Sequence, residues 1–211
     1  MTIVLAGMSV GMMAQDVIQL PAPDKQVDMS LYTALQRRHS VRTYQQREVT
    51  DAILAQVLWA ACGYNREAEK KITAASAINA RQSARLAASA AVVVFVVRKE
   101  GAYRFSPDNN TLKKVSSKDL RPLVAGRQTA VASAPVMLVL ASDQSKFGGR
   151  ESGQRLGLLD AGYVSQNIYL ACTALGLGTV ARATMESEQL AKEMQLGEEF
   201  MLTLNHPIGW E

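Results

Sequence analysis

Residues 160–180, DAGYVSQNIYLACTALGLGTV, combine a long helical pattern with an abrupt end. They belong to the longest helix candidate of the chain, which runs from about Glu151 to Leu175. Gly176 can end that helix, because glycine readily adopts the left-handed conformation found at helix C-termini. The GLGTV segment lacks the third glycine of a dinucleotide-binding fingerprint and follows a helix instead of a strand. The pattern therefore predicts a helix that ends at Gly176 and leads into a connection or short strand.

Apolar runs on both sides of this stretch predict further strands and helices. Residues 90–99, AAVVVFVVRK, and 134–142, APVMLVLAS, are rich in β-branched and aliphatic residues and predict two buried strands. Ser30 can cap the first expected helix, and Thr50 with Asp51 opens the second. Further strands are expected at 101–105 and 198–209, and helices at 31–38, 51–63, 75–89, 119–133 and 186–196. Several helices follow one another directly, which favours an α+β layered fold over a doubly wound parallel sheet.

The composition is that of an ordinary globular domain. The chain has 211 residues, of which 48% are hydrophobic, so it can bury a substantial core. We expect a single domain over residues 28–211. The 23 lysines and arginines only slightly exceed the 19 acidic residues, and most of them are scattered. Nucleic-acid-binding modules instead cluster basic residues with aromatic ones, so no nucleic-acid partner is expected.

The cysteines and histidines do not form a metal-binding pattern. Cys62 and Cys172 lie in apolar, helix-like contexts, where a free cysteine behaves as a small buried hydrophobic residue. His39 and His206 are far apart in sequence and have no HExxH-type neighbours. We therefore expect neither a disulfide framework nor a metal site.

Residues 1–15, MTIVLAGMSVGMMAQ, are apolar and small and precede a proline-containing segment. They are similar to the hydrophobic region and cleavage zone of a secretory signal, although the basic region is missing. This interpretation predicts a truncated signal and export to the periplasm. The alternative is an ordered arm or strand in a cytoplasmic protein. The segment is too short to span a membrane, and no membrane association is expected.

Residues 35–44, LQRRHSVRTY, place Arg38 and Arg42 four positions apart with Ser40 between them, just past a predicted helix. Guanidinium groups bind phosphate oxygens in bidentate geometry, and a serine hydroxyl adds a further donor. The alternative is that arginines near a helix C-terminus simply interact with the helix dipole and with water. The segment alone favours this second interpretation, which also applies to Arg37.

Motifs that would supply a catalytic side chain are missing from the sequence. It contains no Gly-x-Ser-x-Gly nucleophile elbow and no Gly-x-x-x-x-Gly-Lys-Ser/Thr phosphate loop. Neither histidine lies in a recognisable triad context. An enzyme with this sequence would therefore take its reactive group from a cofactor.

The order of motifs resembles that of the nitroreductase superfamily of FMN-dependent oxidoreductases, from about Leu31 to Gly209. The sequence is most similar to compact members with an opening like RRSVRxY. The matching segments are RRHSVRTY (37–44), VLWAACGYNR (57–66), AASAINARQ (74–82), GAYRF (101–105), APVMLVLAS (134–142), residues 160–180 and HPIG (206–209).

This resemblance implies a mostly antiparallel central sheet flanked by helices, in an intertwined homodimer with FMN at the subunit interface. It also implies that Arg38, His39, Ser40 and Arg42 hold the phosphate and ribityl chain of FMN. These residues match the family segment with that role. The resemblance thus reverses the preference for a merely solvated helix end.

Other implied contacts come from two later segments. Asn79 matches an asparagine that approaches the flavin ring, although Ala75 replaces the usual proline and the following segment is longer than expected. Residues 181–184, among them Ala183 and Thr184, fall where the family places backbone groups over the flavin. Gln166 and Asn167 are interpreted as interface or structural residues.

The implied activity is hydride transfer from NADH or NADPH to a small-molecule electron acceptor in a ping-pong cycle. Flavin N5 would carry the chemistry, so no catalytic side chain is expected. The acceptor would be a nitroaromatic, a quinone or a similar conjugated compound. The alternative is a flavin-binding protein of the same fold with no turnover or with a specialised one.

Overall fold

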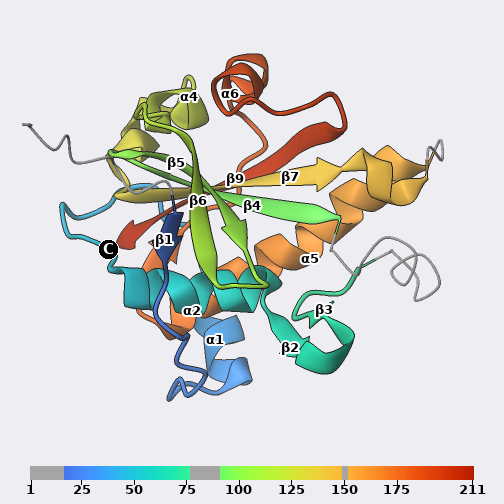
Figure 1. Ribbon diagram of the computed structural model, residues 1–211. Coiled ribbons are helices and arrows are strands. Elements are labelled where there is room, and N and C mark those ends of the chain that lie inside the picture. The colour runs from blue at the N-terminus through green and yellow to red at the C-terminus, as the bar shows by residue number, and fades with distance from the viewer. Residues whose placement is uncertain (1–16, 77–90, 149–151) are drawn as a thin grey trace, which may run out of the picture.

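The structure is a computed structural model that describes residues 17–76, 91–148 and 152–211. Its centre is a seven-stranded sheet in which every strand pair among the described residues is antiparallel (Figure 1). The spatial order is β1 (Val17–Gln19), β6 (Thr111–Ser116), β5 (Gly101–Ser106), β4 (Val92–Arg98), β7 (Val136–Asp143), β9 (Phe200–Trp210) and β8 (Leu177–Thr179). The predicted α+β fold with a mostly antiparallel sheet is therefore confirmed.

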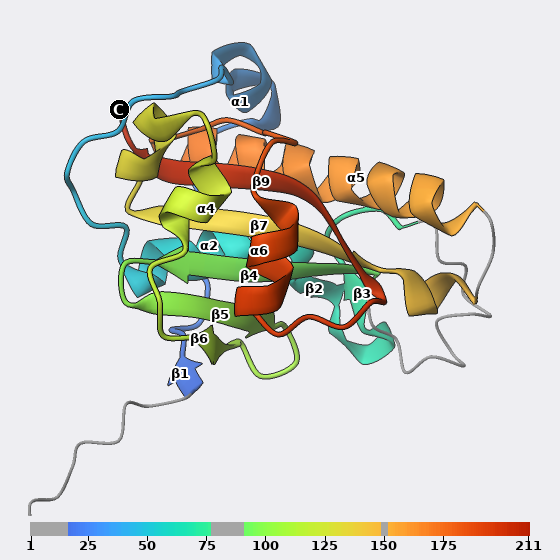
Figure 2. The same cartoon turned by 90° about the horizontal axis from the view of Figure 1, so that it is seen from above.

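Helices cover both faces of this sheet (Figures 1 and 2). One face carries α1 (Leu31–Arg37), α2 (Asp51–Cys62) and α5 (Gly153–Ala174), and the other carries α4 (Arg121–Ala125), α6 (Ser187–Glu193) and the 3-10 turn η2 (Thr129–Ser133). Strands β4 and β7 lie between the two layers, and all residues of β7 are buried. Alternate residues of β4 face opposite layers, with Val94 toward α2 and α5 and Phe95 toward α4 and α6. This two-sided burial explains the continuous apolar runs of both strands.

The remaining short elements lie at the ends of the longer ones. A two-stranded sheet of β2 (Tyr64–Arg66) and β3 (Lys71–Ile72), joined by the 3-10 turn η1 (Glu67–Glu69), follows α2. The 3-10 turn η3 (Gln144–Phe147) follows β7. The sequence did not indicate the small sheet.

The strongest sequence patterns correspond to real elements. Ser30 and Thr50 cap α1 and α2 by accepting hydrogen bonds from backbone N–H groups of the first turn. Helix α5 ends before Gly176, whose φ of 72° is the left-handed conformation expected there. The strand after that helix is β8.

Three regions differ from the expectation or lie outside the described residues. The single helix predicted at 119–133 is divided into α4 and η2, because Gly126 adopts a φ of 54° and ends α4. Strands β1 and β6 were not predicted, and β1 lies upstream of residue 28, the predicted start of the domain. Residues 1–15 and most of the predicted helix at 75–89 lie outside the described residues. Within the described part, no helix is long and apolar enough to cross a membrane.

Candidate functional site

The segment 38–42 leaves the C-terminus of α1 and runs along β8 at the edge of the sheet. The backbone N–H of Val41 donates to the carbonyl oxygen of Thr179 at 2.9 Å. Gly178 makes this contact possible, because a Cβ atom added to it would lie only 2.7 Å from Cγ1 of Val41. The two glycines of GLGTV therefore serve different purposes: Gly176 ends the helix, and Gly178 admits the 38–42 segment.

Burial alternates along this segment. Val41 is buried against the sheet, whereas Ser40 and Arg42 on either side of it are exposed. Arg38 is half-buried. Neither Arg38 nor Arg42 forms an ion pair with a carboxylate of the described residues. Two guanidinium groups and the hydroxyl of an exposed serine are thus available to an anion at this edge, which fits the phosphate group of FMN.

Tyr169 of α5 joins this segment to residues 181–184. Its phenol oxygen lies 3.0 Å from Oγ of Ser40 and accepts a hydrogen bond from the backbone N–H of Ala181 at 2.9 Å. The guanidinium carbon of Arg38 lies 5.0 Å from the centroid of the Tyr169 ring. The structure therefore brings Arg38, Ser40 and the start of the 181–184 segment together around one tyrosine. Ala183 and Thr184, which follow in the same segment, are exposed.

His39 has different partners. Its Nδ1 lies 2.9 Å from the carbonyl oxygen of Arg37, and its Nε2 lies 3.2 Å from a carboxylate oxygen of Glu211. The hydrogen bond to Arg37, followed by the charge of Glu211, raises the pKa of His39. The imidazole is exposed, so its charge can still interact with an anion held by the neighbouring residues.

Arg182 and Asn205 hold the 181–184 segment from beneath. Their backbones pair reciprocally through N–H···O bonds of 2.9 and 2.7 Å, and Nη1 of Arg182 donates to Oδ1 of Asn205 at 2.9 Å. The buried guanidinium also donates to the carbonyl oxygens of Val124 and Ala125 at the end of α4. Nδ2 of Asn205 donates to the carbonyl oxygen of Thr184. These two residues are structural, and the sequence alone did not identify them.

His206 is buried behind Tyr169. Its two ring nitrogens lie 2.8 Å from Oγ of Ser165 and 3.1 Å from Oγ1 of Thr179. Burial lowers the pKa of His206 to about 3, so the imidazole is neutral at physiological pH. The Tyr169 and His206 rings meet edge to face, with centroids 5.3 Å apart and planes at 82°. A neutral, fully enclosed imidazole supports the tyrosine and does not reach a ligand at the surface.

Asn79, Asn167 and Gln166 are the remaining residues that the sequence singled out. Asn79 lies outside the described residues. Nδ2 of Asn167 donates to the carbonyl oxygen of Ala60 at 2.9 Å and so ties α5 to α2, as its structural interpretation required. Gln166 is exposed on α5. Tyr169 was not predicted, although its spacing of four from Ser165 places both on one helix face.

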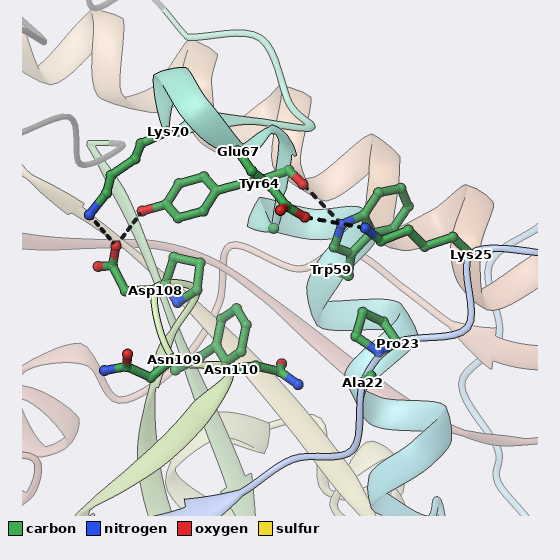
Figure 3. A pocket seen from close by; sticks show the side chains of 13 residues that line it. Ala22, Pro23, Lys25, Trp59, Tyr64, Glu67, Lys70, Asp108, Asn109 and Asn110 are labelled. Atoms are coloured by element: carbon green, nitrogen blue, oxygen red, sulfur yellow. Dashed lines mark hydrogen bonds and ion pairs between the residues drawn. The ribbon is translucent and has the colours of Figure 1, made fainter.

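A cavity of about 610 Å³ lies apart from this edge, at the C-terminal end of α2 (Figure 3). Trp59 and Tyr64 form part of its wall, and its charged groups pair with one another. Nζ of Lys70 lies 2.8 Å from Asp108, to which the Tyr64 hydroxyl also donates. No residue of 38–42 or 181–184 lines this cavity. The predicted anion site is thus distinct from this cavity.

Comparisons with known proteins agree with the observed fold. The model of the nitroreductase family matches residues 35–210. A nitroreductase homologue of Methanocaldococcus jannaschii is 29% identical over 201 residues, which cover 92% of this chain and 97% of that protein. The crystal structure of a nitroreductase homologue of Ralstonia eutropha is 30% identical with a TM-score of 0.83, and the match covers 99% of this chain and 95% of that one.

A more distant likeness concerns the fold alone. A chain of the E. coli microcin synthetase complex is 17% identical with a TM-score of 0.67. The match covers 91% of this chain and 76% of that chain.

Proposed function

Since this chain belongs to the nitroreductase family and is an oxidoreductase of that fold, we propose that it binds FMN and uses NADH or NADPH as electron donor. Bound FMN supplies hydride transfer, in two successive half-reactions, to a nitroaromatic, a quinone or a similar conjugated acceptor. The observation that carries the proposal is that Arg38 and Arg42, on either side of the exposed Ser40 in the chain, form no ion pair with a carboxylate of the described residues. They lie in the segment whose motif matches the phosphate-binding segment of the family.

In this proposal, Arg38 and Arg42 bind the FMN phosphate through charge-assisted hydrogen bonds, and Ser40 adds a neutral donor. The pKa of His39 is raised by its hydrogen bond to Arg37 and by the charge of Glu211, so its imidazole is protonated over a wider pH range beside the phosphate. Ala183 and Thr184 are exposed, and hydrogen bonds of Arg182 and Asn205 hold the backbone of their segment. A backbone contact with the cofactor requires a segment that is fixed in this way. Asn79 is retained as the residue near the flavin ring.

We further propose a homodimer that completes the FMN site. Apolar side chains are exposed on two neighbouring helices, among them Tyr32 of α1, 78% exposed, and Leu158 and Leu159 of α5, 53% and 51% exposed. Burying such neighbouring apolar surface would stabilise association. Light scattering should then give twice the mass of the chain, and Leu159→Glu should lower both this mass and the retention of FMN. A monomer that carries flavin would contradict the dimer.

The phosphate contact is tested by Arg38→Ala and Arg42→Ala. Each should weaken FMN binding by about 1.5–3 kcal/mol, the strength of a hydrogen bond to a charged group. Arg37→Ala is the matched control, because Arg37 is an exposed arginine at the end of the same helix. Titrating apoprotein with FMN measures the affinity. Equal affinity in all three variants and the wild type would contradict the assignment.

Turnover is tested separately from binding. The purified protein should be yellow, and NADH or NADPH should bleach the flavin absorbance in the absence of air. A yellow protein that neither nucleotide bleaches would favour the alternative, a flavin-binding protein without this turnover. A colourless protein that takes up no FMN would exclude both. Assignment to the compact subgroup and export of the chain remain predictions from the sequence.

A further inference from the structure

The Tyr169 hydroxyl takes part in two hydrogen bonds, of which the one from Ala181 has a fixed direction. A backbone N–H can only donate, so the phenol oxygen accepts from Ala181 at 2.9 Å. Oγ of Ser40 lies 3.0 Å from the phenol oxygen, and in this second hydrogen bond either hydroxyl can be the donor. A Ser40 hydroxyl that donates to an anion must accept from Tyr169, and the donors then run from Ala181 through Tyr169 to Ser40.

This direction decides what Ser40 can offer to a ligand. In this arrangement Oγ of Ser40 accepts from Tyr169, and the hydrogen of the serine hydroxyl points to another partner. Ser40 is exposed and lies between Arg38 and Arg42 in the chain, so that hydrogen is available to an anion at the surface. A hydroxyl that already accepts a hydrogen bond is a stronger donor, because bonds in a chain polarise one another.

The same ring also holds Arg38. The guanidinium carbon lies 5.0 Å from the centroid of the Tyr169 ring, within the range of a cation–π contact. A carboxylate would restrain Arg38 but would also neutralise its charge toward a ligand. The aromatic ring restrains the side chain and leaves its charge in place.

Tyr169 is itself held from behind. The edge-to-face contact with His206 fixes the ring, and His206 is held at both nitrogens by Ser165 and Thr179. Thr179 in turn accepts the hydrogen bond from Val41, between Ser40 and Arg42. The tyrosine therefore lies in a closed set of contacts that includes the anion-binding segment.

We propose that Tyr169 is a positioning residue that turns the Ser40 hydroxyl outward as a phosphate donor and holds Arg38 beside it. The identity of the phosphate as that of FMN rests on the proposed function. Tyr169 itself touches no ligand in this scheme, and its effect on binding passes through Ser40 and Arg38.

The experiment compares FMN with riboflavin, which lacks the phosphate. Apoprotein of the wild type, Tyr169→Phe, Ser40→Ala and the double variant is titrated with each flavin, and quenching of flavin fluorescence gives the dissociation constants. Tyr169→Phe keeps the ring and removes only the hydroxyl. Tyr64→Phe is the matched control, because it removes a tyrosine hydroxyl hydrogen-bonded elsewhere, to Asp108.

Tyr169→Phe should weaken FMN binding by about fivefold to tenfold, the effect of a lost hydrogen bond, and should leave riboflavin binding unchanged. In the Ser40→Ala background, Tyr169→Phe should change the free energy of FMN binding by less than about half as much, because the Ser40 hydroxyl on which Tyr169 acts is already absent. Tyr64→Phe should bind both flavins like the wild type.

Equal effects of Tyr169→Phe on FMN and riboflavin, or additive effects with Ser40→Ala, would overturn the proposal. An unchanged FMN affinity in Tyr169→Phe would overturn it as well, while leaving the proposed function intact. A wild-type protein that binds neither flavin would instead refute the proposed function. Melting temperatures of all variants show whether the fold is kept.

Discussion

Gly178 lies against Val41 so closely that a methyl group on the glycine would come within 2.9 Å of three atoms of the valine side chain. This contact brings the edge strand β8 and the predicted phosphate-binding segment together. Val41 separates Ser40 from Arg42, so a displacement of Val41 moves both ligand candidates. The glycine therefore connects the packing of the sheet edge to the affinity of the site.

Gly178→Ala should weaken FMN binding and lower the melting temperature together. Overpacking a close contact typically costs about 1–3 kcal/mol, and the displaced segment carries Ser40 and Arg42 with it. Thermal unfolding and FMN titration measure the two effects. Adding Val41→Ala, which removes two of the three clashing atoms, should restore part of the melting temperature and part of the FMN affinity. A Gly178→Ala protein with unaltered stability and FMN affinity would show that the contact is unimportant.

Arg182→Lys should destabilise the protein although the charge is kept. The buried guanidinium donates to Val124, Ala125, Gln128 and Asn205, and a single ammonium group cannot reach all of these acceptors. Leaving buried acceptors unpaired predicts a loss of about 2–4 kcal/mol in the free energy of unfolding, measured in urea. Arg127→Lys, on an exposed residue nearby, is the control and should change it by less than about 0.5 kcal/mol. Similar values for the two variants would contradict the structural role of Arg182.

The stability of the protein should fall as the pH is lowered below about 6.5. Burial lowers the pKa of His206 to about 3 in the folded state, whereas the unfolded chain binds a proton near the ordinary value of 6.5. Between these values the unfolded state holds more protons, so unfolding becomes easier as pH decreases, by up to about 1.4 kcal/mol per pH unit from this group.

Urea unfolding at several pH values tests this dependence. His206→Gln retains hydrogen-bonding groups but does not titrate, so its stability should vary less between pH 6.5 and 4. His39→Gln is the control and should nearly keep the slope of the wild type in this range, because a raised pKa such as that of His39 changes the slope mainly at and above the ordinary value of 6.5. If the stability of His206→Gln fell with pH as steeply as that of the wild type, the pH dependence would come from other groups.

Cys62 and Cys172 should not react with thiol reagents in the folded protein. Both are free and buried, and burial raises the pKa of the Cys62 thiol to about 12 and also raises that of Cys172. Because the thiolate is the reactive form, Ellman's reagent at pH 8 should detect almost no thiol until a denaturant is added. Two thiols per chain should then appear. Rapid labelling of the native protein would show that one of the helices opens easily.

The sequence predicted those elements whose patterns are local and strong. The apolar runs of β4 and β7 and the cap residues Ser30 and Thr50 depend on neighbours in the chain, and each predicted element is present. Strand β6 was missed because only Leu112 is fully buried among polar neighbours. Strand β1 has three residues, too few for an alternating pattern to be recognised.

The candidate site was predicted unevenly for a similar reason. The motif around Arg38 and Arg42 is contiguous, so a resemblance could identify it. The contacts of Tyr169 with Ser40 and of Arg182 with Asn205 join distant parts of the chain. Such pairs depend on how the helices and strands pack, which no local pattern specifies.

Segments from the N-terminal part of the chain pair with strands at or near both edges of the sheet. Strand β1 pairs with β6 at one edge. The backbone N–H groups of Val41 and Gln45 donate to the carbonyl oxygens of Thr179 and Trp210 near the other edge. Each of these contacts closes a long loop of the chain, and the entropy lost on closing the loop opposes formation of the contact. The meander of β4, β5 and β6 needs no such closure. We therefore expect the residues that carry Ser40 and Arg42 to dock late in folding, onto a sheet whose centre has already formed.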